Sequence, residues 1–467
     1  MTPQRIPALT PKNNQGHHFV CYADCCSGIA GTDREATFAA VNAVVSALDP
    51  APQFICFPGD EIRGLTADEA ELYRQWDHWF NQEMTWLDRE AMPLYHTTGN
   101  HTAYDSVSAR VYREVMAHLP QNGPVGQTSL SYFVRRDDLL LVFVDTMGTG
   151  IGGEGRVETD WLAETLAAHR DASYKFVLGH HPAFAINGYS GAYQRQIDPD
   201  IAPIFWRILV ENGVIAYLCS HMLAFDVQVH QGVLQILTAG AGTPYLTPAE
   251  TEYFHSVQMA VDDDGLRYQV LDTTGTAREW LQWPPRLSVE TVWKPLQLSV
   301  QAAAFQGAPQ TDAPASDLVM WQFSGTIAET TTPDQRSLLA GWNNQTDLMT
   351  FWLGIAGANN QLCLQVWHAP GRSPHMWVGP NLPVGQPFNV QMMVHTGMGA
   401  GGFLYRWGDN EAWSSMIGAS AWGAERMAWP KYWAVGHSQY GVDDRPFQGQ
   451  NLQAVYHHFQ ESVIPNK

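Results

Sequence analysis

The order of strand-like and helix-like segments over residues 18–275 constrains the fold of this 467-residue chain more than any other feature. Short apolar runs such as HFVCYAD, QFICFPGD and YKFVLGHHP have the length and composition of buried strands. Between them lie segments whose apolar residues recur with helical spacing, for example TDREATFAAVNAVVSALD, which begins with a Thr-Asp capping signal. Strands that alternate with helices indicate a layered α/β domain.

The character of the sequence changes after residue 275. Residues 276–295 contain a Pro pair and are predicted to form a linker or a packing segment. Beyond them, runs such as LVMWQFSGTI and QLCLQVWHA alternate in polarity and are separated by Gly, Pro, Asn and Asp, which predicts an all-β sandwich. The chain is too long for one ordinary core. We therefore expect an N-terminal extension (1–17), an α/β domain (18–275), the linker and an all-β domain (296–467).

Polar side chains able to bind a metal follow five of the predicted α/β strands. They are Asp24, Asp60, Asn100 with His101, His180 with His181, and His221. Open α/β sheets place their sites at the carboxyl ends of the strands, so these side chains are expected to converge. A Gly-Asp turn or a lone His is weak evidence by itself, but the ordered set is far more specific. Carboxylate, amide and imidazole donors together suit Zn, Fe or Mn better than Ca or Mg.

The ordered set Asp, Gly-Asp, Gly-Asn-His, His-x-Pro and His resembles the calcineurin-like metallophosphoesterase superfamily, which includes purple acid phosphatases and cyclic-nucleotide phosphodiesterases. The resemblance covers roughly residues 18–275 and extends to FVDTM, GRVETDWLAETLAAH and GVLQILTAGAGTP. It implies a four-layer α/β/β/α sandwich with a dinuclear metal centre. It also implies a phosphoric ester hydrolase, either a phosphatase or a phosphodiesterase.

The resemblance gives different results for the two metal positions. Every residue that the family uses at one position is present: Asp60, Asn100, His180 and His221. At the other position, the family's Asp-x-His motif corresponds to Asp24 and Cys26. A second histidine is replaced by Leu223, which cannot bind a metal. Purple acid phosphatases have a metal-binding Tyr three residues after the shared aspartate, where this chain has Arg63.

Three interpretations follow. In the first, one Fe, Mn or Zn ion is firmly bound at the intact position, and Arg63 stands where the second cation would be. In the second, Cys26 binds as a thiolate and a second ion is retained. In the third, the centre is degenerate and the domain only binds a ligand. An altered centre could also serve related chemistry, on a sulfate ester or a phosphonate or by elimination.

For a small phosphoester substrate, the resemblance assigns His101 to charge stabilisation or to protonation of the leaving group. With one ion missing, Asp24 or another base must activate the nucleophile, and Arg63 is a candidate ligand for a phosphoryl oxygen. His181 and Asp145 are expected to support the metal ligands, because metal-bound imidazoles usually donate to an oxygen acceptor.

The tail YWAVGHSQYGVDDRPFQGQNLQAVYHHF resembles the end of concanavalin A-like, laminin-G-type jelly rolls. Such domains often bind sugars through aromatic planes, and eleven of the 18 tryptophans lie between Trp293 and Trp433. Carbohydrate is therefore a candidate partner of this domain. The alternatives are that these tryptophans fill the core, or that the domain shapes the catalytic cleft or forms a homo-oligomer.

The charge distribution argues against nucleic acid as a partner. The net charge is −20, and residues 1–284 carry 34 acids and 17 bases, against 12 and 9 in residues 285–467. Such a surface repels polyanions. No apolar run reaches the ~20 residues that span a bilayer, so no membrane association is expected. The N-terminus lacks a secretory signal, which predicts a cytoplasmic protein as written, or a periplasmic or secreted one if a signal was removed.

Overall fold

The computed structural model describes residues 5–12, 15–149, 153–188, 195–244, 253–285, 293–296, 306–307, 318–329, 336–342, 349–367, 373–409, 411–418, 430, 432–438 and 445–458. The chain divides into two compact units. The first consists of Met1–Ile186, Gly191–Val227 and Val233–Pro284, and the second of Asn187–Ser190, Gln228–Gly232 and Pro285–Lys467. Among the described residues, no helix has the length and apolarity that crossing a bilayer requires.

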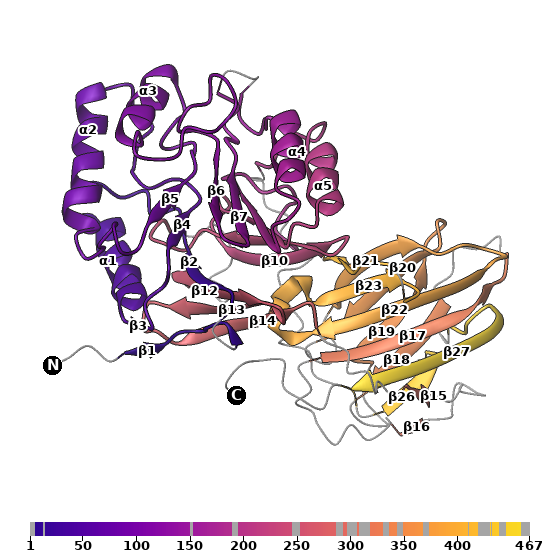
Figure 1. The fold of residues 1–467 in the computed structure, drawn as a ribbon. Coiled ribbons are helices and arrows are strands. Elements are labelled where there is room, and N and C mark those ends of the chain that lie inside the picture. Colours follow the sequence, from indigo (N-terminus) through magenta and orange to yellow (C-terminus); the bar gives the residue numbers. More distant parts are fainter. Residues whose placement is uncertain are drawn as a thin grey trace. The chain divides into compact units, whose positions relative to one another are not determined.

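Two six-stranded sheets form the centre of the first unit (Figure 1). One has the order β14-β13-β12-β2-β4-β5 and the other β10-β11-β9-β8-β7-β6. The strands of the first sheet are β2 (His17–Cys21), β4 (Ile55–Phe57), β5 (Leu94–His96), β12 (His255–Asp262), β13 (Gly265–Asp272) and β14 (Ala277–Trp283). Those of the second are β6 (Tyr132–Arg136), β7 (Leu139–Phe143), β8 (Tyr174–Leu178), β9 (Ala216–Cys219), β10 (Phe225–His230) and β11 (Val233–Thr238). Strands β2, β4 and β5 are parallel, as are β7, β8 and β9, so each sheet gathers several carboxyl ends at one edge.

Helices flank the two sheets and complete the predicted α/β layering. Figure 1 shows one group on one side and a second group on the other. The groups are α1 (Asp33–Ser46), α2 (Glu69–His78) and α3 (Ser106–Val115), and α4 (Thr159–Ala168) and α5 (Ala202–Glu211). Side chains cap three of the amino termini, because Thr32, Asp68 and Asp105 accept hydrogen bonds from the backbone of α1, α2 and α3. A π-helical turn, η2 (Trp79–Glu83), continues α2.

Both ends of the α/β segment differ from the sequence expectation. Within the expected N-terminal extension, β1 (Ile6–Pro7) pairs with β3 (Leu48–Asp49), and the amide of Leu9 donates to Gln258 Oε1 at 2.7 Å. The expected linker, 276–295, contains β14, which pairs with β13 because Leu281 and Trp283 are buried there. Residues 277–283 therefore agree with the packing-segment alternative and not with a linker, and 286–292 lie outside the described residues.

The described part of the second unit is an all-β structure of two sheets. Their orders are β15-β27-β17-β22-β23-β24 and β16-β26-β18-β19-β20-β21-β25, and every recorded pair is antiparallel. The strands are β15 (Lys294–Leu296), β16 (Gln306–Gly307), β17 (Leu318–Ile327), β18 (Arg336–Trp342), β19 (Phe351–Ala356), β20 (Gln361–Val366), β21 (His375–Asn381), β22 (Pro387–His395), β23 (Phe403–Trp407), β24 (Ser414–Ser415), β25 (Ile417–Gly418), β26 (Tyr432–Val435) and β27 (Gly449–His458). A 3₁₀ segment, η4 (Thr396–Gly402), follows β22. The jelly-roll assignment stays a prediction.

Most described tryptophans of this unit are packing residues. Trp321, Trp377 and Trp433 belong to the main core between the sheets. Trp342 and Trp352 belong to a smaller cluster and are 1% and 0% exposed. A buried ring cannot stack on a sugar, so these five favour the core interpretation. Trp422 and Trp429 lie outside the described residues.

Candidate metal centre

Several candidate ligands follow strand ends in an unusual backbone conformation. Asp24 follows β2, Asp60 follows β4 and His221 follows β9, with φ of +61°, +60° and +71°. Cys26 also has a positive φ of +43°. Non-glycine residues in this region cost about 1–3 kcal/mol each, and such strain tends to occur at functional sites. The four residues are buried, so the sharp turns bring their side chains together inside the first unit.

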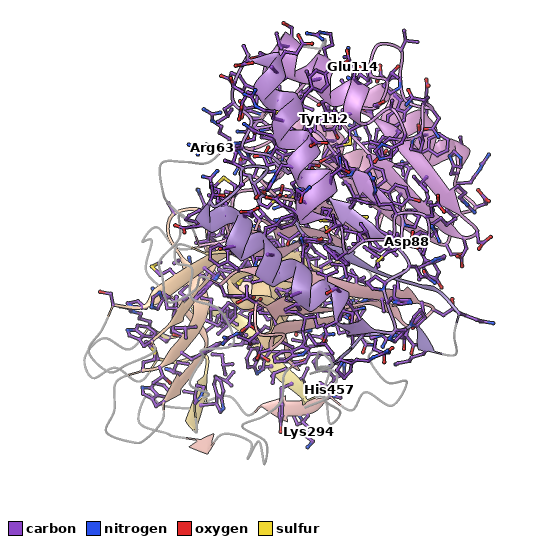
Figure 2. All side chains as sticks on the ribbon, turned by 90° about the vertical axis from the view of Figure 1, so that its left-hand side faces the viewer. Arg63, Asp88, Tyr112, Glu114, Lys294 and His457 are labelled. Atoms are coloured by element: carbon purple, nitrogen blue, oxygen red, sulfur yellow. The ribbon has the colours of Figure 1, made fainter. Side chains whose placement is uncertain are left out.

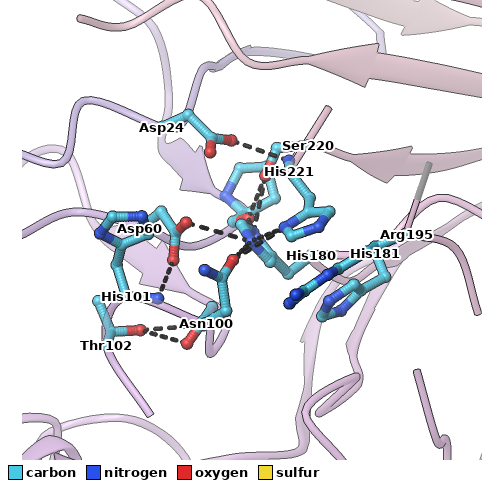
Figure 3. Close-up of polar contacts among 12 residues, drawn as sticks. Asp24, Asp60, Asn100, His101, Thr102, His180, His181, Arg195, Ser220 and His221 are labelled. Carbon is cyan, nitrogen blue, oxygen red and sulfur yellow. Dashed lines mark hydrogen bonds and ion pairs between the residues drawn. The ribbon is translucent and has the colours of Figure 1, made fainter. Parts of the chain in front are cut away.

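Four predicted ligands converge on one point (Figure 3). Asn100 Oδ1 lies 3.1 Å from His180 Nε2 and 2.8 Å from His221 Nδ1. The two ring nitrogens are 3.1 Å apart, and Asp60 Oδ2 lies 3.3 Å from His180 Nε2. Asp60, Asn100, His180 and His221 thus point two oxygens and two nitrogens at a common centre.

This arrangement fits a transition metal. Ligands bonded at ~2.0–2.2 Å around one tetrahedral ion lie roughly 3.3–3.6 Å from one another, and the contacts of 2.8–3.3 Å among these atoms are close to that spacing. His180 Nδ1 lies 2.9 Å from both the Pro58 carbonyl oxygen and Ser220 Oγ, so its Nε2 faces the centre. Such outer contacts fix an imidazole ligand in place.

Burial and neighbouring charges shift the pKa values of these groups in different directions. Burial disfavours an ionised Asp60, but the adjacent His180 and His101 hold its pKa well below the usual range. Burial opposes the imidazolium form of His180, but Asp60 and Asp24 raise its pKa to about 9. Burial, His181 and His180 lower the pKa of His221 well below its usual value. The pair Asp60–His180 is therefore ionised, while His221 is neutral and able to ligate.

The neighbouring, altered position contains a second set of donors. Cys26, Asp60 and His101 each offer an atom within 4.8 Å of the others. Burial, with Asp60 and Asp24 nearby, raises the pKa of the Cys26 thiol well above its usual value. Asp24 Oδ2 accepts a hydrogen bond from the His221 amide at 2.9 Å, and burial and Asp60 raise the pKa of Asp24 to about 6. These donors share Asp60 with the first set.

Arg63 does not occupy the place of a second cation. Its amide donates to the Ser27 carbonyl at 2.8 Å, and its own carbonyl oxygen lies 2.5 Å from His101 Nδ1. The Arg63 side chain is exposed (Figure 2). His101 itself is partly exposed, and its amide donates to Asp60 Oδ1 at 2.8 Å.

The hydrogen bonds of Asp145 and His181 go to groups other than the ligating imidazoles, although the His181 ring lies 4.4 Å from the His221 ring between centroids. Asp145 accepts hydrogen bonds from Thr98 Oγ1 at 2.5 Å and from two amides of its own loop, so it anchors that loop after β7. His181 Nδ1 lies 2.8 Å from Thr146 Oγ1, and its Nε2 lies 3.1 Å from Glu154 Oε1. The sequence expectation that Asp145 supports an imidazole ligand is not what this geometry shows.

Two residues beside the centre were not foreseen from the sequence. Glu154, His181 and His221 offer ligand atoms within 4.8 Å of one another. Arg195 Nη1 lies 3.0 Å from both oxygens of Glu154, and its side chain is 51% exposed. Figure 3 shows Arg195 beside His181. Neither Glu154 nor Arg195 follows a strand end, so no pattern in the sequence singles them out.

Comparison with solved structures finds distant similarity. The chain is similar to the purple acid phosphatase PPD1 from yellow lupin seeds at 11% identity, covering 58% of this chain and 54% of that one, with a TM-score of 0.45. It is similar to a dimetal phosphatase from Danio rerio at 13% identity, covering 55% and 96%, with a TM-score of 0.38. It is also similar to GAP50 from Plasmodium, at 13% identity and a TM-score of 0.40, covering 58% and 90%. No curated protein matches the chain.

The comparison with family models agrees with the ordered motifs. The matching segment contains all four converging ligands, together with Asp24, Cys26 and His101. Residues 17–225 match the family model of the calcineurin-like phosphoesterases, which confirms the superfamily resemblance for this part of the chain.

Proposed function

We propose that the protein is a metal-dependent hydrolase of a small phosphoester, with one transition metal ion held by Asp60, Asn100, His180 and His221. The convergence of their four donor atoms, 2.8–3.3 Å apart along the measured contacts, carries this proposal. Fe, Mn and Zn all suit two imidazole nitrogens and two oxygens. When bound, the ion supplies Lewis-acid polarisation of a phosphoryl oxygen and acidifies a bound water.

The protein side chains supply the proton transfers. Asp24 has a pKa of about 6, which is suitable for a general base near neutral pH. His101 lies at the partly exposed rim and is fixed through its amide to Asp60 and its Nδ1 beside the Arg63 carbonyl. We assign to His101 the protonation of the leaving group, because an imidazole at the rim can both donate a proton and reach solvent.

We assign the binding of substrate oxygens to Arg195 rather than to Arg63. The Glu154 carboxylate fixes the Arg195 guanidinium and itself lies within 4.8 Å of His181 and His221 ligand atoms. Guanidinium groups bind phosphoryl oxygens through parallel hydrogen bonds. A phosphoester bound at the centre would thus have a cation on the side of His221.

The main alternative within this proposal is a centre with two metal ions instead of one. Cys26, Asp60 and His101 could hold a second ion, with Cys26 as a thiolate, because metal coordination deprotonates a thiol. A further alternative, of another class, is a protein that binds a carbohydrate or other ligand without catalysis. Chemistry on a sulfate ester or phosphonate would use the same centre.

Metal content and hydrolysis together test the proposal. We expect the protein purified without chelator to contain metal, about one ion per chain of it at this centre, and to cleave bis-p-nitrophenyl phosphate or p-nitrophenyl phosphate. His221→Ala should lose about one ion per chain, Cys26→Ser should lose none, and His169→Gln at the C-cap of α4 serves as a control. If Cys26→Ser instead lowers the metal content by about one ion per chain, the thiolate site is supported. A metal-free, inactive protein that Mn, Fe and Zn fail to rescue would refute the enzyme proposal.

A further inference from the structure

A second cluster of potential metal ligands lies outside the candidate metal centre. Glu35 belongs to the first turn of α1, His78 is the last residue of α2, and Glu83 ends η2. Each offers a ligand atom within 4.8 Å of the other two. Glu35 Oε1 lies 2.6 Å from His78 Nε2, and Glu83 Oε1 lies 3.7 Å from the same nitrogen. Three donors from three elements therefore face one point.

The π-helical turn creates this convergence. In an α-helix each residue turns by about 100°, so two side chains five residues apart point about 140° away from each other around the helix axis. Glu83 follows His78 by five residues and would point elsewhere if α2 continued as an α-helix. The amide of Met84 instead donates to the Trp79 carbonyl at 3.0 Å, an i→i+5 bond. Such π-helical turns are rare in proteins, and those that do occur are often found at functional sites.

Both carboxylates are oriented by hydrogen bonds from outside the cluster. The amide of Gly31 donates to Glu35 Oε2 at 2.6 Å. Ser27 Oγ donates to Glu83 Oε1 at 2.5 Å, and the amide of Gly28 donates to the same oxygen at 3.1 Å. The donors all come from the loop that follows Cys26, so this loop fixes the carboxylates in the positions they need.

The cluster brings two carboxyl groups and one imidazole together, and burial raises the pKa of the Glu83 carboxyl. The side chains of Glu35, His78 and Glu83 are 28%, 21% and 4% exposed. Two carboxylates face one imidazole, which can neutralise at most one of them. A divalent ion would balance both carboxylates and could complete its coordination with water on the exposed side.

We propose that Glu35, His78 and Glu83 bind a divalent transition metal ion, Zn²⁺ or Mn²⁺, at a site separate from the candidate metal centre. Two carboxylate oxygens and one imidazole nitrogen match the donors that these ions take in proteins. The bound ion joins α1 to the end of α2 and, through Ser27, Gly28 and Gly31, fixes the loop between Cys26 and α1. This inference does not depend on the proposed hydrolase activity.

Zinc titration of the full-length chain tests the site. The His221→Ala variant weakens the candidate metal centre, so we use it as the background and remove metal with a chelator. Isothermal titration calorimetry with Zn²⁺ should then resolve binding at this site from the weaker binding that is left at the candidate metal centre. Adding Glu35→Gln should weaken Zn²⁺ binding at this site at least tenfold, and His78→Gln should abolish it.

Matched controls separate this site from unfolding and from adventitious binding. Glu71→Gln changes another acid of α2, which pairs with Arg74, and should leave the affinity unchanged. Glu35 is partly exposed, so Glu35→Gln should fold normally, as circular dichroism can check. Equal Zn²⁺ affinity in the background and in both Glu35→Gln and His78→Gln would overturn the proposal. So would equal weakening by Glu71→Gln.

Discussion

At the scale of single residues, the candidate centre combines conformational strain with charge burial. Asp24, Cys26, Asp60 and His221 all have positive φ, and all are at most 3% exposed. Each feature lowers stability, and neither is needed to build the sheets. Their coincidence at the strand ends is consistent with a site whose geometry serves binding rather than stability.

The first prediction concerns Arg195. We expect Arg195→Ala to lower kcat/KM for a phosphomonoester by about 10- to 100-fold, because a charged hydrogen-bond partner of the substrate is worth about 1.5–3 kcal/mol. Steady-state kinetics with p-nitrophenyl phosphate measures the change. Arg63→Ala is the matched control, since its exposed side chain should change kcat/KM less than twofold. Equal effects of the two substitutions would contradict the assignment.

The second prediction concerns the pH dependence of metal binding. The pKa of His180 is raised to about 9, mainly by Asp60 against the effect of burial, so its imidazole is protonated at neutral pH. A metal ion binds only the neutral imidazole and must displace that proton. We expect the affinity to rise about tenfold per pH unit between roughly pH 6 and 8. Calorimetric titrations in buffers of different ionisation enthalpy should show proton release, and a pH-independent affinity would rule this out.

At the scale of elements, the sequence predicts those helices and strands whose positions follow from the spacing of apolar residues. The strands at β2, β4 and β8 and the helix α1 lie where the apolar patterns place them. The π-helical turn was not predicted, because helical periodicity does not distinguish an i→i+5 turn from an i→i+4 turn over five residues. Strand β14 was missed because its Pro pair and flanking polar residues suggest a linker, whereas pairing with β13 decides its structure.

The third prediction concerns the end of β22, where His395 is buried. Burial lowers the pKa of His395 to about 4, below the ordinary value of 6.5, so the unfolded chain binds the proton more readily. The stabilising effect of neutral His395 is therefore present above about pH 6.5 and is lost as pH falls toward 4. The loss amounts to about 3 kcal/mol. Denaturant unfolding at a series of pH values should show a steeper decline for the wild type than for His395→Gln.

The control for this prediction is His375→Gln in β21. This histidine is only half buried, so its removal should leave the pH dependence close to that of the wild type. Parallel declines for the wild type and His395→Gln would show that other groups dominate acid destabilisation of the second unit.

At the scale of the whole molecule, the candidate centre depends on tertiary structure that no local pattern contains. The order of motifs predicted Asp60, Asn100, His180 and His221, because strand ends of one fold converge. It could not predict which way Arg63 points, since turn geometry decides that. Glu154 and Arg195 come from loops, where sequence carries no positional signal, so their approach to His181 is visible only in the fold.

The last prediction concerns metal removal from the whole chain. An ion held by the folded first unit and not by the unfolded chain stabilises that unit by about 2.7 kcal/mol at a free concentration of 100 Kd. For a unit of this size, that corresponds to a fall in Tm of roughly 5–10 °C on chelation. Differential scanning calorimetry of the full-length protein, with and without added Zn²⁺ after chelation, measures the shift. His221→Ala should show a clearly smaller response than the wild type, because Asp60, Asn100 and His180 alone bind the ion more weakly. An identical response in the two proteins would place the stabilising ion elsewhere.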